Sequence, residues 1–110
     1  MSRYFPTNAE CGHLTVFGTT KLRTYAGDHV QLSFVDIPAD GVVDWHSHPN
    51  EQIGVMITGR AAFHIGDEVK TLGPGEFFFI PGGVRHKVVA EDSPAQALDV
   101  FYPIREEYRG

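Results

Sequence analysis

The stretch GVVDWHSHPNEQIGVMITG, residues 41–59, carries two histidines, His46 and His48, separated by one serine. Residues i and i+2 of a strand project from the same face, so both imidazoles can reach one point. The dipeptide Pro49-Asn50 predicts a bend, after which Gln52 begins the next strand on the matching face. The stretch therefore predicts two neighbouring strands that present two imidazoles and an amide to one side.

A second stretch, GPGEFFFIPGGVRH at residues 73–86, ends in a further histidine. Three neutral imidazoles around one point suit a first-row transition metal, and an amide oxygen can complete the set. Fe, Mn, Co, Ni and Zn all accept such ligands, so the ligand types do not choose among them. We therefore expect one divalent transition metal ion, with ligands from His46, His48, Gln52 and His86.

Glu51 is the alternative to Gln52 as the fourth ligand, and strand parity and spacing both favour Gln52. The remaining histidines, His13, His29 and His64, lack a partner at ligand spacing and are interpreted as polar-face residues. Of these, only His64 lies near enough to the expected barrel interior to line the site. Trp45 and the run Phe77-Phe78-Phe79 are interpreted as sheet packing, with one or two of them walling the pocket.

Glycine and proline divide the rest of the chain into short strands. No stretch without either exceeds ten residues, which is shorter than an average helix of about 11–12 residues and excludes a helical bundle. Apolar and polar residues alternate between these marks, as Val30, Leu32 and Phe34 do with Gln31 and Ser33. Strands at such even spacing fold into a sandwich or a barrel.

The composition is that of one ordinary globular domain. Its 110 residues are 42% hydrophobic and 21% charged, so we expect one domain over residues 1–110, with its core at about 14–104. The 9 basic against 14 acidic residues argue against nucleic-acid binding. No apolar run approaches the roughly 20 residues of a membrane span. One cysteine, Cys11, cannot form an internal disulfide, so we expect a cytoplasmic protein.

The two stretches together resemble the paired motifs of the cupin superfamily, G-x5-H-x-H-x3-4-E-x6-G and G-x5-P-x-G-x2-H-x3-N. The match runs from Gly41 to Ala90, about half the chain. Three positions depart from it: the gap before His46 is one residue short, Ala90 replaces the final Asn, and Gln52 replaces the usual Glu. The resemblance implies an all-β fold, the double-stranded β-helix, which is a small jelly-roll-like barrel of two antiparallel sheets.

The glutamine changes the charge of the expected metal site. Glu would bring one negative charge to the ion, whereas Gln52 brings none. A bound cation therefore keeps its full formal 2+ charge, which makes it a stronger Lewis acid and a better anchor for an anion. This property favours non-redox chemistry without excluding redox chemistry.

The segment ALDVFYPIREEY, residues 97–108, combines charged and apolar residues. Asp99 and Phe101 share one strand face, and an Asp inside an apolar strand is costly unless it meets a partner or a ligand. Pro103 ends the strand, and Arg105 offers a planar fork that suits a carboxylate. A structural ion pair between Asp99 and Arg105 is the alternative interpretation.

This ending, with the three-histidine and one-glutamine set, resembles small single-domain cupins of the pectin-degradation KdgF type. Those proteins typically carry HxHPHEQ and a DxFxPxRED ending, and they open and ketonise 4,5-unsaturated uronate monosaccharides released by pectate and alginate lyases. The resemblance implies metal ligands at His46, His48, Gln52 and His86, catalytic roles for Asp99 and Arg105, and substrate contacts from Arg105 and Phe101. The departures from the family pattern are Asn50 for a common His, Tyr102 before Pro103, and Glu107-Tyr108 for Asp-Phe.

The resemblance favours a metal-dependent isomerase of a small anionic sugar acid, with Arg105 clamping the carboxylate and Asp99 moving a proton. Three alternatives stay open. They are a cupin-type polyketide cyclase, which needs a wider and more aromatic pocket, an iron-dependent dioxygenase, and a non-catalytic sugar-acid-binding cupin. Small cupins are commonly dimers, so the resemblance also implies a homodimer, in which apolar N-terminal strands pair.

Overall fold

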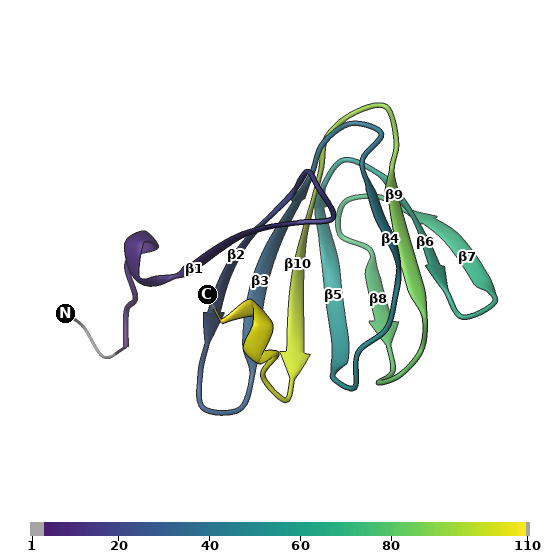
Figure 1. Cartoon of the computed structure of the whole chain (residues 1–110). Helices are drawn as coiled ribbons and strands as arrows, with labels where there is room; N and C mark the ends of the chain where they lie inside the picture. The colour runs from purple at the N-terminus through teal and green to yellow at the C-terminus, as the bar shows by residue number, and fades with distance from the viewer. Residues whose placement is uncertain (1–3, 110) are drawn as a thin grey trace.

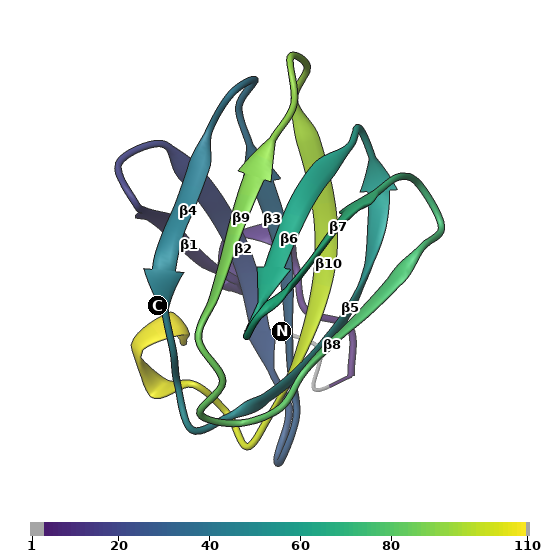
Figure 2. The ribbon, with the colours of Figure 1, turned by 90° about the vertical axis from the view of Figure 1, so that its right-hand side faces the viewer.

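The computed structural model describes residues 4–109 as two antiparallel sheets that pack face to face (Figure 1). The larger sheet contains, in spatial order, β1 (Gly12–Val16), β2 (Thr20–Ala26), β3 (Gln31–Ile37), β10 (Ala95–Tyr102), β5 (Glu51–Thr58) and β8 (Phe77–Ile80). The smaller contains β4 (Val42–His46), β9 (His86–Ala90), β6 (Ala61–Ile65) and β7 (Glu68–Leu72). Figure 2 shows the smaller sheet in front of the larger one. The predicted double-stranded β-helix is confirmed.

Two short 3-10 helices accompany the sheets: η1 (Asn8–Glu10) and η2 (Glu106–Tyr108). The helix η1 precedes β1, and η2 lies beyond the end of β4 in Figure 2. No helix within residues 4–109 is long and apolar enough to cross a membrane.

Alternating burial along the strands builds one core between the two sheets. On β10, for example, every second residue is buried from Ala95 to Phe101. Burying a large apolar side chain contributes about 1.5–3 kcal/mol to stability. The large buried apolar side chains of the core are Leu22, Val35, Ile37, Met56, Phe63, Leu72, Phe78, Ile80 and Val88.

Strand β3 alternates as predicted, but its apolar residues at the start of the strand lie on the outer face. Gln31 and Ser33 are fully buried, whereas Leu32 and the preceding Val30 are about half exposed. The inner face of β3 meets a polar part of the barrel here, where the Gln31 side chain bonds to the backbone of Arg105. Alternation separates the two faces of a strand, and it does not tell which of them is buried.

Strand β4 contains an irregularity that turns its last residue inward. Val43 pairs with Val88 and His46 pairs with His86, so β4 advances three residues while β9 advances two. Such a one-residue bulge shifts the alternation, and both Val43 and His46 line the interior. The strand ends at His46, so His48 lies in the following loop rather than on the strand that the i, i+2 argument assumed.

Candidate functional site

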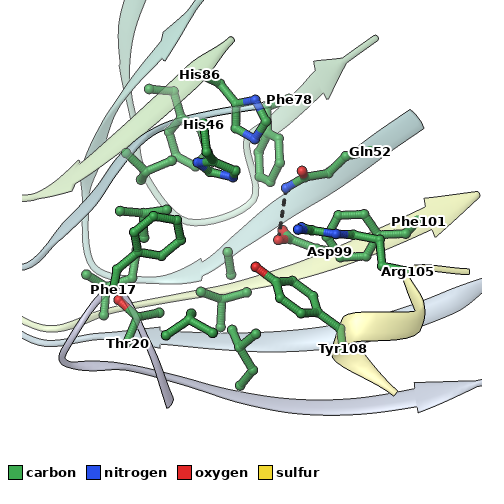
Figure 3. A pocket seen from close by; sticks show the side chains of 18 residues that line it. Phe17, Thr20, His46, Gln52, Phe78, His86, Asp99, Phe101, Arg105 and Tyr108 are labelled. Carbon is green, nitrogen blue, oxygen red and sulfur yellow. Dashed lines mark hydrogen bonds between the residues drawn. The ribbon is translucent and has the colours of Figure 1, made fainter. Parts of the chain in front are cut away.

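Three of the predicted metal ligands meet at one end of the barrel interior. His46 ends β4, His48 lies in the loop between β4 and β5, and His86 begins β9. Ring nitrogens of the three histidines all lie within 4.8 Å of one another. Their ring centres are as close as 4.1 Å for His46 and His86, which Figure 3 shows side by side. The three histidines form a triad that can hold a metal ion.

Backbone carbonyl groups fix the tautomer of each histidine. Each ring places Nδ1 against the carbonyl oxygen of a residue two positions away, and because a carbonyl only accepts, the hydrogen lies on Nδ1. Burial lowers the pKa of all three, that of His86 to about 4, so the rings are neutral at pH 7 and Nε2 carries a lone pair. The pairs are His46 with Asp44 at 2.8 Å, His48 with Asn50 at 3.0 Å, and His86 with Val84 at 2.9 Å.

The lone pairs of His86, His48 and Gln52 are placed so that a shared cation would satisfy them. Nε2 of His86 is buried and has no hydrogen-bond partner. Nε2 of His48 lies 3.0 Å from Oε1 of Gln52, and because the His48 hydrogen is on Nδ1, both atoms are acceptors with no proton between them. A positive ion would satisfy all of these lone pairs, so the residues present fit a divalent metal ion. Gln52 as its fourth ligand stays a prediction, which this contact supports.

Asp99 sets the orientation of the Gln52 amide. Nε2 of Gln52 donates a hydrogen bond of 3.0 Å to Oδ2 of Asp99, drawn as the dashed line in Figure 3. The opposite orientation would set the amide oxygen against the carboxylate, so Oε1 has to point to the histidines. Gln52 therefore connects the triad with Asp99. Glu51, its sequence neighbour, is exposed.

Asp99 is a buried carboxyl group on the inner face of β10. Burial raises its pKa to about 7, although the nearby positive charge of Arg105 and the hydrogen bond from Gln52 both act against that rise. Its strand partner is Gly54, where an added Cβ would collide with the Phe78 ring and lie 2.9 Å from Oδ1 of Asp99. The glycine therefore leaves room for the carboxyl group.

Arg105 lies beyond β10 and is equally buried, at 7% exposure for each residue. Its guanidinium lies between two aromatic rings, 3.8 Å from the centre of Tyr108 and 5.2 Å from that of Phe101. It forms an ion pair of 3.3 Å with Glu107. Among the ion pairs within 4.0 Å in residues 4–109, none joins Arg105 to Asp99, so the structural ion pair of the alternative interpretation is absent.

Buried polar side chains from the barrel hold the segment 103–108 against the site. Arg105, in this segment, is buried. Asn50, which departs from the family motif, also binds His48 through its carbonyl. The hydrogen bonds run from Asn50 to the Pro103 carbonyl at 2.6 Å, from Thr24 to the Tyr108 carbonyl, and from Gln31 to both the amide and the carbonyl of Arg105, at 3.0 and 3.3 Å.

One cavity of about 50 Å³ is lined by His46, His86, Gln52, Asp99 and Arg105. This volume holds an ion and a small polar group, since one water needs about 10–15 Å³ on this measure. Among the described residues, three buried side-chain atoms lack a hydrogen-bond partner, and all three belong to residues that line this cavity. They are Oγ1 of Thr20, Nε2 of His86 and Nε of Arg105. Unpaired buried polar atoms around one cavity indicate a binding site for a polar ligand.

Phe78 walls the cavity, as expected for one or two residues of its run, but three other lining residues, Phe17, Thr20 and Tyr108, had no role in the sequence reasoning. Tyr108 and Phe17 are two of them, and Figure 3 shows their rings apart from each other among the lining side chains; Thr20 is the third. Phe17 lies in the turn after β1 with a ring centre 5.0 Å from that of His46. Of these residues, only Tyr108 could have been singled out from the sequence, because it departs from the family pattern.

Several other predictions have a clear outcome. His13 and His29 are exposed, and His64 packs against Trp45, with ring centres 5.8 Å apart, without lining the cavity. Phe78 packs in the core, but its neighbours Phe77 and Phe79 are mostly exposed. The interpretation of this run as sheet packing was therefore wrong for two of its three residues, because β8 lies at the edge of a sheet whose outer face is open.

Comparison with known proteins places the chain in a family. A family model described as a cupin domain matches residues 33–101. The dimethylsulfoniopropionate lyase DddQ of Ruegeria pomeroyi is 35% identical over 75 residues, which are 67% of this chain and 37% of DddQ. The chain thus spans little more than a third of the length of this curated relative.

Two solved structures are similar over nearly the whole chain. An RmlC-like cupin from Shewanella frigidimarina has a TM-score of 0.85 at 20% identity and covers 97% of this chain and 96% of its own. KdgF from Halomonas sp. has a TM-score of 0.81 at 24% identity and covers 92% of this chain and 94% of its own. At these identities the likeness concerns the fold, and with the matching family model it shows that the chain belongs to the cupin domain family.

Proposed function

We propose that this cupin is a metal-dependent isomerase that opens and ketonises 4,5-unsaturated uronate monosaccharides. One observation carries the proposal: a buried carboxyl group and a buried guanidinium, which are not paired with each other, line the same cavity as His46 and His86 of the histidine triad. Similarity in fold to KdgF supports it. The acid–base group, the anion clamp and the triad are the three parts that this reaction needs.

The reaction moves protons and changes no oxidation state overall. The bond from C1 to the ring oxygen breaks, the anomeric hydroxyl loses its proton and becomes a carbonyl, and the ring oxygen becomes the enol hydroxyl on C5. The enol then loses its proton from oxygen while C4 gains one, which converts the C4=C5 double bond into a C5 ketone. The formula is unchanged, so no oxidant or reductant is required.

Asp99 and Arg105 have complementary roles in this scheme. The substrate carboxylate is attached to C5, next to the carbon that gains the proton, so its clamp and the proton donor must lie close together. Arg105 would bind the carboxylate, with its guanidinium plane held between Phe101 and Tyr108. Asp99, with a pKa raised to about 7 by burial, can both give and accept a proton at neutral pH.

His46, His48, His86 and Gln52 would hold the metal ion. When bound, a divalent ion supplies Lewis acidity for substrate oxygen atoms. The Oγ1 of Thr20, which has no partner within the protein, is available for a substrate hydroxyl. The cavity of about 50 Å³ admits the reacting end of a small acid, whereas a polyketide cyclase needs a wider pocket. The cavity therefore favours the isomerase over the cyclase.

Cleavage of a small carboxylate is the second candidate function. The identity of 35% with a dimethylsulfoniopropionate lyase favours it, and such a substrate would use the same carboxylate clamp and proton-transfer group. It requires bond cleavage into two products, whereas the isomerase yields one product of unchanged mass. Product mass therefore separates the two functions.

The deciding experiment is incubation of the metal-loaded protein with unsaturated galacturonate freshly released by a pectate lyase. Loss of the ultraviolet absorbance of the conjugated double bond should be faster than in buffer, with a product of the same mass as the substrate. The His46→Ala/His86→Ala variant is the control for spontaneous opening. Wild-type protein with confirmed metal content and no acceleration would contradict the isomerase. Dimethylsulfoniopropionate, assayed in parallel, tests the second candidate.

A further inference from the structure

Tyr108 ends the helix η2 and brings a phenol ring to the cavity. The ring is half-buried against the apolar core, and Figure 3 shows its hydroxyl oxygen on the side of Asp99, away from η2. Two backbone contacts hold the residue: its amide donates to the carbonyl of Arg105 at 3.0 Å, and its carbonyl accepts from the side chain of Thr24. The position of the hydroxyl group is therefore fixed by the fold.

The aromatic contacts of Tyr108 do not need its hydroxyl group. The ring centre lies 3.8 Å from the guanidinium carbon of Arg105 and 6.0 Å from the ring centre of Phe101. A phenylalanine, which is the usual residue of the resembling cupins at this position, would make the same two contacts. A hydroxyl group in a partly buried place costs free energy unless it forms a hydrogen bond. The hydroxyl of Tyr108 therefore indicates a polar partner in the cavity.

We propose, on the basis of the isomerase function proposed above, that the Tyr108 hydroxyl binds the ring oxygen of the substrate and exchanges a proton with it. The ring oxygen and the carboxylate are both attached to C5. A carboxylate held by Arg105 therefore brings the ring oxygen beside the residue that stacks on Arg105. The cavity of about 50 Å³ has room for about three to five water-sized groups, which keeps Tyr108, Asp99 and the reacting atoms together.

The free side of Arg105 faces the same space. One terminal nitrogen of its guanidinium pairs with Glu107, whereas Nε is buried and has no partner. The substrate carboxylate is therefore expected on the Nε side. Because Nε belongs to a residue that lines the cavity together with Tyr108, a carboxylate bound there presents its neighbouring ring oxygen to the cavity.

The Tyr108 hydroxyl is suited to donate a proton. Burial raises the pKa of Tyr108 above its ordinary value, while the positive charge of Arg105 acts against that rise. The phenol thus keeps its hydrogen at neutral pH. A guanidinium group only donates, so Arg105 leaves this hydrogen free for an acceptor such as an ether oxygen.

Tyr108 and Asp99 would divide the proton transfers of the isomerisation. In ring opening, the Asp99 carboxylate takes the proton of the anomeric hydroxyl while the bond from C1 to the ring oxygen breaks, and Tyr108 gives its proton to that oxygen, which becomes the enol hydroxyl. In ketonisation, the Tyr108 phenolate takes the enol proton back, and Asp99 gives its proton to C4. Both residues return to their starting states. The positive charge of Arg105 stabilises the phenolate between the two steps.

Tyr108→Phe tests the proton transfer, because it keeps the stacked ring and removes only the hydroxyl group. With unsaturated galacturonate, kcat should fall about 10²–10³-fold, and KM should rise less than about 10-fold. The matched control is Tyr102→Phe, which removes a hydroxyl group from a ring that is 56% exposed and does not line the cavity; it should keep wild-type rates. Melting temperature and metal content establish that both variants are folded. Near wild-type kcat in Tyr108→Phe, in a protein that is active, overturns the inference and leaves the isomerase function intact.

A binding experiment tests the hydrogen bond without catalysis. The probe 3,4-dihydro-2H-pyran-6-carboxylate has the ring oxygen, the double bond and the carboxylate of the substrate, and it cannot open because it lacks the anomeric hydroxyl. In cyclohex-1-ene-1-carboxylate a methylene group replaces the ring oxygen. In calorimetric titrations, metal-loaded wild type should bind the first probe about 2–10-fold more tightly than the second, and Tyr108→Phe should bind both equally. Equal binding by wild type, or a preference that survives in Tyr108→Phe, overturns the inference whether or not the protein accelerates ring opening.

Discussion

The two ends of the barrel interior use the same strands for different purposes. On the inner face of β3, Ile37 and Val35 belong to the apolar core, and two residues further Ser33 is as deeply buried. On β10 the change occurs between Ala97 and Asp99. Depth of burial is the same at both ends, and only the chemistry of the side chains differs. One end stabilises the fold by apolar contact, and the other must pair each polar group.

The difference shows where a ligand is expected. At the polar end the side chains of Gln31, Asn50 and Gln52 each donate a hydrogen bond, whereas the described buried atoms without a partner lie on residues that line the cavity. An unpaired buried polar atom costs about 1–3 kcal/mol. A protein that leaves such atoms around one cavity trades some stability for binding capacity.

Of the changes predicted here, the removal of two histidines should have the largest effect, a loss of metal affinity. His46→Ala/His86→Ala deletes two of the three imidazoles at the polar end, and metal affinity should fall at least about 10⁴-fold, since even supporting residues contribute 10–100-fold each. Metal content by mass spectrometry after dialysis measures it. Asp99→Asn, at the same end, should keep its metal. Equal metal content in the double variant and wild type would refute the site.

Asp99→Asn should lower turnover by about 10²–10⁴-fold, because it removes a positioned acid–base group while keeping the shape of the side chain. Folding and substrate affinity should change little. Arg105→Ala should instead reduce affinity first, and Arg105→Lys should recover the charge without the forked geometry. Initial rates and melting temperatures of the three variants separate these effects. Near wild-type turnover in Asp99→Asn would make Asp99 a structural residue.

A pair of variants compares the two ends directly. Gln31→Ala leaves the amide and carbonyl of Arg105 unpaired and should cost about 1–3 kcal/mol. Met56→Ala, in the apolar core and away from the cavity lining, should cost about 2–5 kcal/mol by leaving a void. Only Gln31→Ala should also weaken substrate binding, because it loosens the segment that carries Arg105. Urea unfolding and substrate titration test both variants. An equal loss of substrate binding in the two would contradict the division of the barrel interior into an apolar end and a polar binding end.

The smallest effect concerns the pH dependence of the metal-free protein. The folded-state pKa of His86 is lowered to about 4, so as pH falls from 6.5 to 4 the unfolded chain gains a proton that the folded state does not, and stability decreases. Asp99, raised to about 7, has the opposite sign: the folded state binds the extra proton in this window, so stability increases as pH falls. The two trends oppose each other.

Asp99→Asn removes one of these trends. The free energy of unfolding of the metal-free variant should therefore fall more steeply between pH 6.5 and pH 4 than that of wild type. Urea titrations at several pH values within the window measure the slope. If the variant and the wild type share one slope, the folded-state pKa of Asp99 is not raised.

Much of this arrangement is readable from the sequence because it depends on local spacing. The bend at Pro49-Asn50 and the inward parity of Gln52 and Asp99 follow from turn chemistry and strand geometry. The i, i+2 argument for His46 and His48 assumed a strand that in fact ends at His46. The bulge in β4 could not be read in this way. It inserts one residue between Val43 and His46, and a shift of one residue reverses every inward and outward assignment that follows.

Contacts between distant parts of the chain were also beyond the sequence pattern. Gln31 meets Arg105 across 74 positions, and nothing in their local surroundings predicts that meeting. The burial of Gln31 in place of Leu32 has a related cause, because the inner face of β3 needs a polar side chain there to hold the backbone of Arg105. Apolar alternation predicts that the polar residues of a strand face solvent, whereas here Gln31 is buried and Leu32 is about half exposed.

Gln52 has a consequence for spectroscopy. Its side-chain NH₂ group is covalently one atom away from the oxygen that faces the histidines, and it donates to Asp99. The chemical shifts of these two protons therefore respond to the ionisation of Asp99 on one side and to the electron demand on the amide oxygen on the other. A single pair of nitrogen-15-edited resonances can thus record a pH titration and a metal titration in the same sample, before any substrate is known.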